Sequence, residues 1–444
     1  MPQDNAPKPI SPIELSRFYE ACNPSYTLKM DSPADYRYYI DFSSVRGSNT
    51  IREMERTIAR LSPDKPTCQL FTGHIGCGKS TELSQLKAAL EKQKFHVVYF
   101  ESSHDLDMAD VDVTDILLAI ARQVSESLEA IDINLTPRYF TSLFQELAEM
   151  MKTPVTIEGV SFSAGIASIT AKTKDAPGLR SQLRQFMEPR TNGILDAINE
   201  ELLLPAIDAL KAAGHKGLVV IVDNLDRLDN ALKGGRIQPA YLFVDRGEQL
   251  RKLQCHLVYT VPLVLIFSND LGQLTNRFGV DPKVLPMIPI RQRDGKPAEQ
   301  GMALLRQMVM ARAFPEANMV QRLDPAYVTQ VFDSLETLNR LCSVSGGHVR
   351  NLLALLYRCI QRDDPPISRQ CLESVIQLRA NELRMAVTPD EEALLKKVMQ
   401  TKDVRGEEGH ESLLRSMFVF EYRTEQGGWF DLNPVLAEAK EFQV

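Results

Sequence analysis

The chain has 444 residues, of which 44% are hydrophobic and 25% are charged, and its formal net charge at pH 7 is −7. This composition is typical of a globular protein with room for about three domains, and it excludes a disordered, collagen-like or coiled-coil chain. The acidic balance gives no bulk support for nucleic-acid binding. The seven cysteines, none in C-x-x-C spacing, argue against a disulfide framework or a zinc site and fit a reducing cytoplasm.

The first 50 residues are expected to form a loosely held lead-in. A short helix is predicted near 12–21 and a strand over Tyr36–Phe42. The first residues lack the apolar stretch of a secretory signal, and the longest apolar stretch, Leu257–Phe267, is too short to cross a bilayer. We therefore expect a cytoplasmic protein without membrane contact.

Residues 51–295 alternate between helical and strand-like patterns. The predicted order is helix 50–61, strand 67–71, helix 79–93, strand 97–100, helix 113–128, strand 218–222, helix 240–253 and strand 256–261. This alternation predicts an α/β fold with a parallel sheet. Within it, the apolar–polar alternation of 155–172 predicts an inserted β-hairpin.

From residue 296 onward the pattern is helical. Helices are predicted over 297–313, 325–342, 347–361 and 368–385, which make a helical lid domain at 296–386. Residues 387–444 carry two helical stretches, 390–400 and 409–416, and then two strands, 418–423 and 429–432, joined by a glycine-containing turn. Helices followed by a hairpin predict a winged-helix domain.

A phosphate-binding loop is predicted at Gly73–Ser80, whose sequence GHIGCGKS fits G-x-x-x-x-G-K-[ST] and lies between an apolar strand and a helix. Its glycines let backbone N–H groups face an anion, and the helix start adds a positive dipole end. Lys79 is expected to reach the β- and γ-phosphates of ATP, and Ser80 to bind Mg²⁺. The predicted nucleotide contacts here are Gly73, His74, Ile75, Gly76, Cys77, Gly78, Lys79, Ser80 and Thr81.

Two kinds of acidic segment stand out. In LVVIVDNLD, residues 218–226, Asp223 follows an apolar strand and is predicted to hold Mg²⁺, while Asp226 is predicted to orient or deprotonate the attacking water. A run of aspartates at 105, 107, 110, 112 and 115 lacks the glycine and the terminal glutamate of a calcium loop. We expect a solvated loop and a helix start there.

The ordered motifs resemble those of AAA+ and STAND P-loop ATPases, most closely the origin-recognition initiators and the NACHT-like signalling ATPases and less closely the KAP NTPases. The resemblance covers Tyr39 to the C-terminus. In many AAA+ proteins glutamate directly follows the strand-end aspartate, whereas this chain has Asn224. The departure implies either that Asp226 takes over the catalytic role or that hydrolysis is slow.

The resemblance also assigns two arginines. Arg277, in Leu274–Phe278, matches an arginine finger, which reaches the γ-phosphate of a neighbouring subunit; the alternative is a surface arginine in an ion pair. Arg350, in Ser345–Leu353, matches the sensor 2 arginine of the lid; the alternative is a helix that merely begins after two glycines.

Weaker assignments complete the predicted nucleotide site. Sensor 1 falls on Thr260, with Asn269 as the alternative. Val45 and Arg46 lie just before the first strand of the core, where related proteins hold adenine.

These features predict a switch that uses ATP and Mg²⁺ to control a homo-oligomer and a separate partner or effector protein, as in signalling or antiviral defence. Residues 390–444 hold seven basic and twelve acidic residues, a net charge of −5, which favours protein contact over DNA. Two alternatives stay open. One is an initiator-like ATPase that binds DNA through the winged helix, and the other is a scaffold that binds ATP without hydrolysing it.

Overall fold

The computed structural model describes residues 13–47, 49–135, 137–150, 163–167, 177–404, 409–424 and 427–442. The chain forms two compact units. We call residues 50–73 and 82–284 the sheet unit, and residues 1–49, 74–81 and 285–444 the lid unit. No helix of the described ranges is long and apolar enough to span a membrane.

A five-stranded parallel sheet in the order β2-β3-β6-β1-β7 forms the centre of the sheet unit. Its strands are β1 (Cys68–Thr72), β2 (His96–Glu101), β3 (Leu218–Asp223), β6 (His256–Thr260) and β7 (Lys283–Val284). Every residue of β3 is buried, as expected for a strand covered on both faces. The parallel sheet is therefore confirmed, and four of its strands lie where they were predicted.

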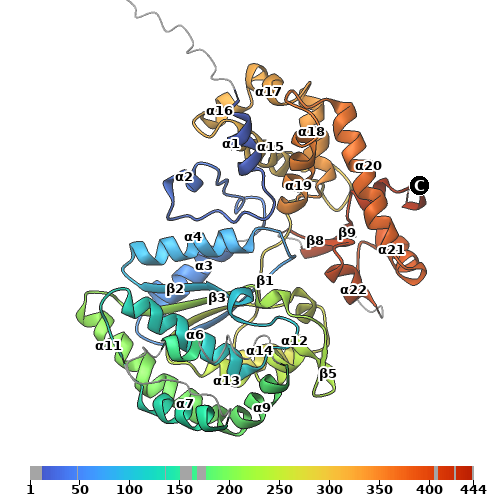
Figure 1. Ribbon diagram of the computed structural model, residues 1–444. Coiled ribbons are helices and arrows are strands. Elements are labelled where there is room, and N and C mark those ends of the chain that lie inside the picture. Colours follow the sequence, from blue (N-terminus) through green and yellow to red (C-terminus); the bar gives the residue numbers. More distant parts are fainter. Residues whose placement is uncertain are drawn as a thin grey trace, which may run out of the picture. The chain divides into compact units, whose positions relative to one another are not determined.

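Helices cover both faces of this sheet. In Figure 1, α3 (Thr50–Arg56) and α4 (Lys79–Lys92) lie on one side, and α6 (Val113–Glu129) and α13 (Gly247–Arg251) on the other. The other helices and turns of the unit are η1 (Thr57–Leu61), α5 (Ser102–Asp105), α7 (Arg138–Met150), α9 (Pro177–Met187), η2 (Glu188–Arg190), α10 (Thr191–Ala197), η3 (Ile198–Leu203), α11 (Leu204–Ala212), η4 (Leu225–Arg227), α12 (Gln238–Ala240), η5 (Tyr241–Asp245), η6 (Leu263–Ile266) and α14 (Leu271–Phe278). A short hairpin pairs β4 (Leu232–Lys233) with β5 (Arg236–Ile237).

Two predictions for this unit differ from the structure. The helix expected over 240–253 is divided into α12, η5 and α13. A side chain at Gly247 would meet the Phe278 ring at 2.6 Å, so α14 packs directly on the backbone where α13 begins. Of the hairpin predicted at 155–172, residues 163–167 form a helical turn instead, and the remainder lies outside the described residues.

The lid unit is helical around one apolar core. Its helices are α1 (Leu15–Ala21), α2 (Pro33–Tyr36), α15 (Glu299–Ala313), α16 (Met319–Arg322), α17 (Pro325–Val331), α18 (Leu335–Val344), α19 (Val349–Ile360), α20 (Arg369–Met385), α21 (Pro389–Thr401), α22 (His410–Arg415), η7 (Leu436–Glu438) and η8 (Lys440–Phe442). The strands β8 (Val419–Thr424) and β9 (Gly427–Leu432) form the antiparallel hairpin predicted after α22.

Local capping explains two corrections in the lid unit. The strand predicted over Tyr36–Phe42 is absent from these described residues, because Ser32 and Pro33 start a helical turn that ends at Tyr36. The single helix predicted over 325–342 is two helices. Ser334 starts the second of them, since its hydroxyl accepts a hydrogen bond from the Thr337 N–H at 3.2 Å.

Candidate nucleotide site

The phosphate loop follows β1 and leads into α4. Gly73, Gly76 and Gly78 have φ values of 153°, 87° and 107°, which residues with a side chain rarely adopt. The helix begins at Lys79, so its first turn carries Lys79, Ser80 and Thr81. The sequence motif therefore has the backbone shape that it requires.

Four successive carbonyls of this loop accept hydrogen bonds within the lid unit. The His74 carbonyl accepts from the Lys79 ammonium at 2.8 Å, and the Ile75 carbonyl from the His348 ring at 2.8 Å. The Gly76 carbonyl accepts from the Arg350 N–H at 3.1 Å. The Cys77 carbonyl accepts from the Arg46 guanidinium at 2.7 Å.

These bonds fix the direction of the peptide groups. In a trans peptide the N–H points opposite to the preceding carbonyl. Anchoring the carbonyls of residues 74, 75 and 77 therefore directs the N–H groups of Ile75, Gly76 and Gly78 away from their anchors. N–H groups presented in sequence at a helix start form a concave anion site, which is the chemistry that a polyphosphate requires.

His348 is a member of this arrangement that sequence reasoning missed. It is 2% exposed and lies one residue before α19, where its Nδ1 accepts from the Asn351 N–H at 3.0 Å. That bond leaves the proton on Nε2, which donates it to the Ile75 carbonyl. Burial lowers the pKa of His348 to about 4, so the ring is neutral. The feature of the sequence that could have identified His348 is its position after two glycines and directly before a helix.

The close approach of the start of α19 to the phosphate loop depends on Gly76. A Cβ at this position would lie 2.8 Å from Cε1 of His348 and 2.9 Å from Cβ of Arg350. Arg350, predicted as sensor 2, is thus placed at the loop through its backbone, while its side-chain Nε donates to the Pro24 carbonyl at 3.3 Å. Arg46, predicted beside adenine, lies on the phosphate loop, and Val45 packs against the lid core.

The β8–β9 hairpin also contacts the phosphate loop. The Glu421 N–H on β8 donates to Nε2 of His74 at 2.9 Å, and the Tyr422 hydroxyl donates to the Gly346 carbonyl at 2.8 Å. The Phe420 ring stacks on His348 with centroids 5.4 Å apart and meets His74 edge-on at 5.8 Å. Burial and the neighbouring His348 and Lys79 lower the pKa of His74 well below its ordinary value, so both histidines are uncharged.

A second group of residues, which we call the acidic cluster, lies in the sheet unit. Glu101, Asp223 and Thr260 are the last residues of the neighbouring strands β2, β3 and β6, at the carboxyl edge where parallel sheets bind ligands. Asp223 is fully buried. Its two carboxylate oxygens accept from the Tyr99 hydroxyl at 2.8 Å and from the Asn224 N–H at 2.7 Å.

A tight turn follows Asp223. Asn224 has φ 67°, in the left-handed region, and its Nδ2 donates to Oε2 of Glu101 at 2.7 Å and to the Ser103 hydroxyl at 3.3 Å. The Thr260 hydroxyl accepts from the Leu225 N–H at 3.0 Å, so the residue predicted as sensor 1 braces this turn. Asp226, the predicted catalytic acid, is 8% exposed on η4.

Arg277 stands apart from this cluster within the sheet unit. It lies in the last turn of α14 with its side chain 47% exposed, and its guanidinium is 3.8 Å from a carboxylate oxygen of Glu248. The structure thus places the predicted arginine finger on the surface of the unit, in a weak ion pair.

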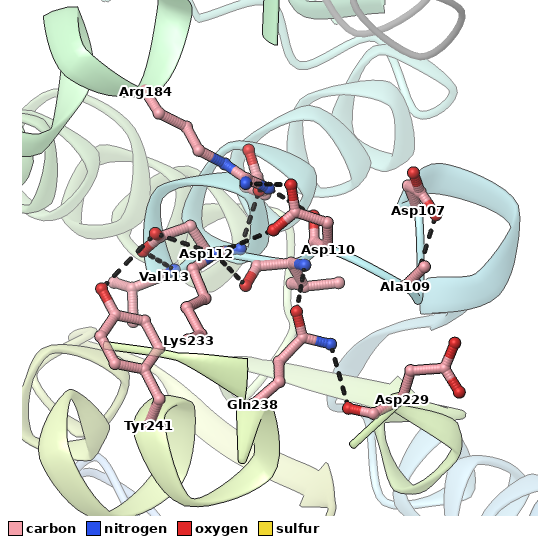
Figure 2. A network of polar contacts seen from close by, with 12 residues as sticks. Asp107, Ala109, Asp110, Asp112, Val113, Arg184, Asp229, Lys233, Gln238 and Tyr241 are labelled. Atoms are coloured by element: carbon pink, nitrogen blue, oxygen red, sulfur yellow. Dashed lines mark hydrogen bonds and ion pairs between the residues drawn. The ribbon is translucent and has the colours of Figure 1, made fainter. Parts of the chain in front are cut away.

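The aspartate run is less solvated than predicted. Asp112 caps α6 together with Asp115, so the helix start is confirmed. Arg184 binds Asp110 and Asp115, and Lys233 lies 3.3 and 3.2 Å from Asp110 and Asp112. Figure 2 shows Arg184 and Lys233 beside Asp110 and Asp112. Burial would raise the pKa of Asp110, but these cations hold it below its usual value.

This network also fixes the segment that follows η4. The Gln238 side chain accepts from the Val111 N–H at 2.7 Å and donates to the Met108 carbonyl at 3.0 Å. It also donates to the Asp229 carbonyl at 3.5 Å (Figure 2). Together with Lys233 it ties the β4–β5 hairpin to the start of α6. The aspartate run therefore helps to hold the segment that follows Asp226 and η4.

Comparison with known proteins identifies the core. The KAP family P-loop domain matches residues 47–232. Similar solved structures include Aeropyrum pernix ORC2 in ADPNP–ADP complexes, Aeropyrum pernix ORC1 in complex with DNA, and Drosophila ORC bound to DNA, at 12%, 13% and 12% identity and a TM-score of 0.38 each. These alignments cover 86%, 91% and 100% of this chain and 89%, 96% and 95% of those chains. No curated protein matches the chain.

The family match and the strand order confirm the predicted α/β P-loop core and the resemblance to P-loop ATPases. With TM-scores below 0.5, the solved structures add nothing to that assignment. The matching KAP family is the one that the sequence motifs resembled less closely than the origin-recognition initiators and the NACHT-like ATPases. The chain carries a P-loop NTPase core, and nucleotide binding is the function that this core supports.

Proposed function

We propose that the protein is an ATP-hydrolysing switch whose nucleotide state controls its assembly and its contact with a partner protein. The observation that carries the proposal is the anchoring of four successive phosphate-loop carbonyls, from His74 to Cys77. A loop shaped in this way presents N–H groups to a polyphosphate, and the Lys79 ammonium lies at its end.

Hydrolysis needs a metal ion beside the phosphates. The donors available are hard oxygen atoms, the Ser80 hydroxyl at the start of α4 and the buried carboxylate of Asp223, which suit Mg²⁺. These two residues would hold the ion, which supplies positive charge to the transferring phosphoryl group. The departure at Asn224 is consistent with slow turnover, as a switch requires.

Contacts within the lid unit support the coupling of nucleotide state to the winged helix. The phosphate loop and the turn before α19 both bond to β8, through His74 and through Gly346. A change in the phosphate loop on hydrolysis would alter the position of the β8–β9 hairpin, because the loop and the hairpin are joined by a buried hydrogen bond. Such a two-state element is the physical requirement of a switch.

The charge of the C-terminal domain supports a protein partner over DNA. Residues 390–444 carry a net charge of −5, and DNA phosphates would repel such a surface. For assembly we propose that Arg277 completes the nucleotide site of a neighbouring copy, since its ion pair to Glu248 is long and half-exposed and is worth about 1 kcal/mol at most.

The test is the mass of the protein in solution with and without ATP–Mg²⁺, with double-stranded DNA present in one arm. We expect a mass increase with ATP–Mg²⁺, its reversal on hydrolysis, and no DNA in the complex. Arg277→Ala should bind ATP but lose the mass increase, whereas Lys252→Ala, which removes another partner of Glu248 at 2.9 Å, should keep it.

Three results would decide against the switch. Retention of DNA in the complex supports the initiator-like alternative. ATP binding without phosphate release supports the scaffold. A mass that is the same with and without nucleotide removes the assembly part of the proposal.

A further inference from the structure

The residue after the strand-end aspartate cannot act as a general base. Residue 224 is asparagine, and an amide does not take a proton from water at neutral pH. If the chain hydrolyses ATP with a general base, that base is a residue other than Asn224. The carboxyl edge of the sheet contains a carboxylate that sequence reasoning did not consider.

Glu101 is the last residue of β2, and it lies in register beside Asp223 of β3. Its side chain is half-buried, so water can reach it. One carboxylate oxygen accepts a hydrogen bond of 2.7 Å from Asn224. The asparagine therefore holds a carboxylate next to the metal-binding aspartate instead of supplying one itself.

The backbone of the turn is shaped for this contact. Asn224 adopts the left-handed conformation, which asparagine tolerates better than most residues. Asn224 is 2% exposed, and its side-chain amide donates hydrogen bonds to Glu101 and to the Ser103 hydroxyl. An amide donor orients a carboxylate without removing its basicity, whereas a guanidinium would neutralise it.

The two carboxylates at this edge are held separately. Asp223 is fixed by Tyr99 and by its own following N–H, and Glu101 by Asn224. Separate supports allow separate roles, one carboxylate for the metal ion and one for the water. Asp226, by comparison, is 8% exposed on the turn that Thr260 braces, so water reaches its carboxylate less readily than that of Glu101.

We propose that Glu101 is the general base of ATP hydrolysis and that Asn224 positions it; this rests on the proposed ATPase function. The oxygen of water forms a bond to the γ-phosphorus while one of its protons passes to Glu101. The bond from the γ-phosphorus to the bridging oxygen breaks, and its electron pair stays on ADP. Glu101 then returns the proton to the released phosphate, which leaves the enzyme unchanged.

The test compares Glu101→Gln with Asp226→Asn in the full-length chain. Titration with ATP measures binding, and single-turnover phosphate release measures hydrolysis. Glu101→Gln should keep ATP affinity within about threefold and lower kcat by at least about 100-fold, the usual contribution of a general base. Asp226→Asn should keep more of the wild-type kcat than Glu101→Gln does.

Matched variants separate the base from a structural role. His104→Asn changes an exposed side chain three residues from Glu101 and should leave kcat within about threefold. Asn224→Gly keeps the positive φ without strain but frees Glu101, and should lower kcat by about tenfold with ATP affinity unchanged. Should Glu101→Gln fail to fold, Asn224→Gly decides: unchanged turnover there overturns the proposal.

The outcomes distinguish this inference from the function beneath it. A wild-type chain that does not bind ATP, or binds it without turnover, overturns the ATPase proposal and the general base with it. A wild-type chain that hydrolyses ATP while Glu101→Gln keeps its rate overturns only the role of Glu101. Loss of turnover in Asp226→Asn alone assigns the base to Asp226.

Discussion

The phosphate loop of the lid unit and the acidic cluster of the sheet unit are held by different kinds of contact. In the lid unit, the phosphate loop bonds to Arg46, His348 and Arg350, which lie far from it in sequence. In the sheet unit, Asp223 bonds to Tyr99 and to its own turn, all at the ends of paired strands. The acidic cluster is therefore held within the sheet, whereas the phosphate loop is also held by residues from distant segments of the lid unit.

This difference indicates where regulation acts. A site held by neighbouring strands has few alternatives, because moving it would break the sheet. A loop held by side chains from other segments has a second arrangement available when those segments move. Under the proposed switch, a partner bound at the β8–β9 hairpin would change nucleotide affinity through the phosphate loop and leave the acidic cluster unaltered.

The largest expected effect comes from removing the charge in the loop. Lys79→Ala should weaken ATP binding by at least about 100-fold, because a charge-assisted contact to phosphate is lost and a buried site loses its cation. Calorimetric titration measures the affinity. Lys92→Ala, at the other end of α4, is the control and should bind ATP as the wild type does. Equal affinity of both variants would show that the loop does not bind the phosphates.

Acidic pH should weaken the contacts that hold the phosphate loop, because two buried histidines, His348 and His74, take part in them. Burial holds the pKa of His348 at about 4, against 6.5 when unfolded, and that of His74 is also well below 6.5. The unfolded chain therefore takes protons first as the pH falls below 6.5. The stability that neutral histidine provides is complete above pH 6.5 and is lost toward pH 4, by about 3 kcal/mol for His348.

The measurement is the free energy of unfolding in denaturant between pH 7 and 4. His348→Asn retains an acceptor for the helix start and should flatten the dependence. His104→Asn, at an exposed position, should leave the dependence unchanged. An unaltered slope in His348→Asn would contradict the assignment of a buried neutral ring.

A steric change tests the loop contact directly. Gly76→Ala places a Cβ within 3 Å of His348 and Arg350 at a positive φ, so we expect a loss of about 2 kcal/mol in stability together with weaker ATP binding. Thermal unfolding and titration read the two effects. Gly272→Ala, with nothing within 4 Å of its added Cβ, is the matched control and should change neither.

The smallest expected effect concerns the β8–β9 hairpin. Tyr422→Phe removes the hydroxyl bond to Gly346 and keeps the ring stack on Trp429, at a cost of about 1 kcal/mol. Tyr259→Phe removes a similar bond to Leu250 inside the sheet unit. Both variants should lose comparable stability, but only Tyr422→Phe should alter ATP affinity. Equal effects of the two variants on ATP affinity would contradict the different roles given to the phosphate loop and the acidic cluster.

The parts of the site that were predictable are the local ones. The phosphate loop and Asp223 are carried by contiguous segments, in which a strand, a turn and a helix start follow one another. His348, Glu421 and Glu101 were missed because their roles come from pairing between distant segments, which no periodicity encodes. The strand expected at Tyr36–Phe42 failed for a local reason, the start of a helix at Pro33.

One consequence follows from Cys77, which lies inside the phosphate loop. All seven cysteines are buried and reduced, and the thiol of Cys77 faces the Leu285 carbonyl at 3.7 Å. A thiol reagent can react there only when the loop is exposed. The alkylation rate of Cys77, followed by mass spectrometry with the other six cysteines as internal standards, therefore measures how often the phosphate loop becomes exposed.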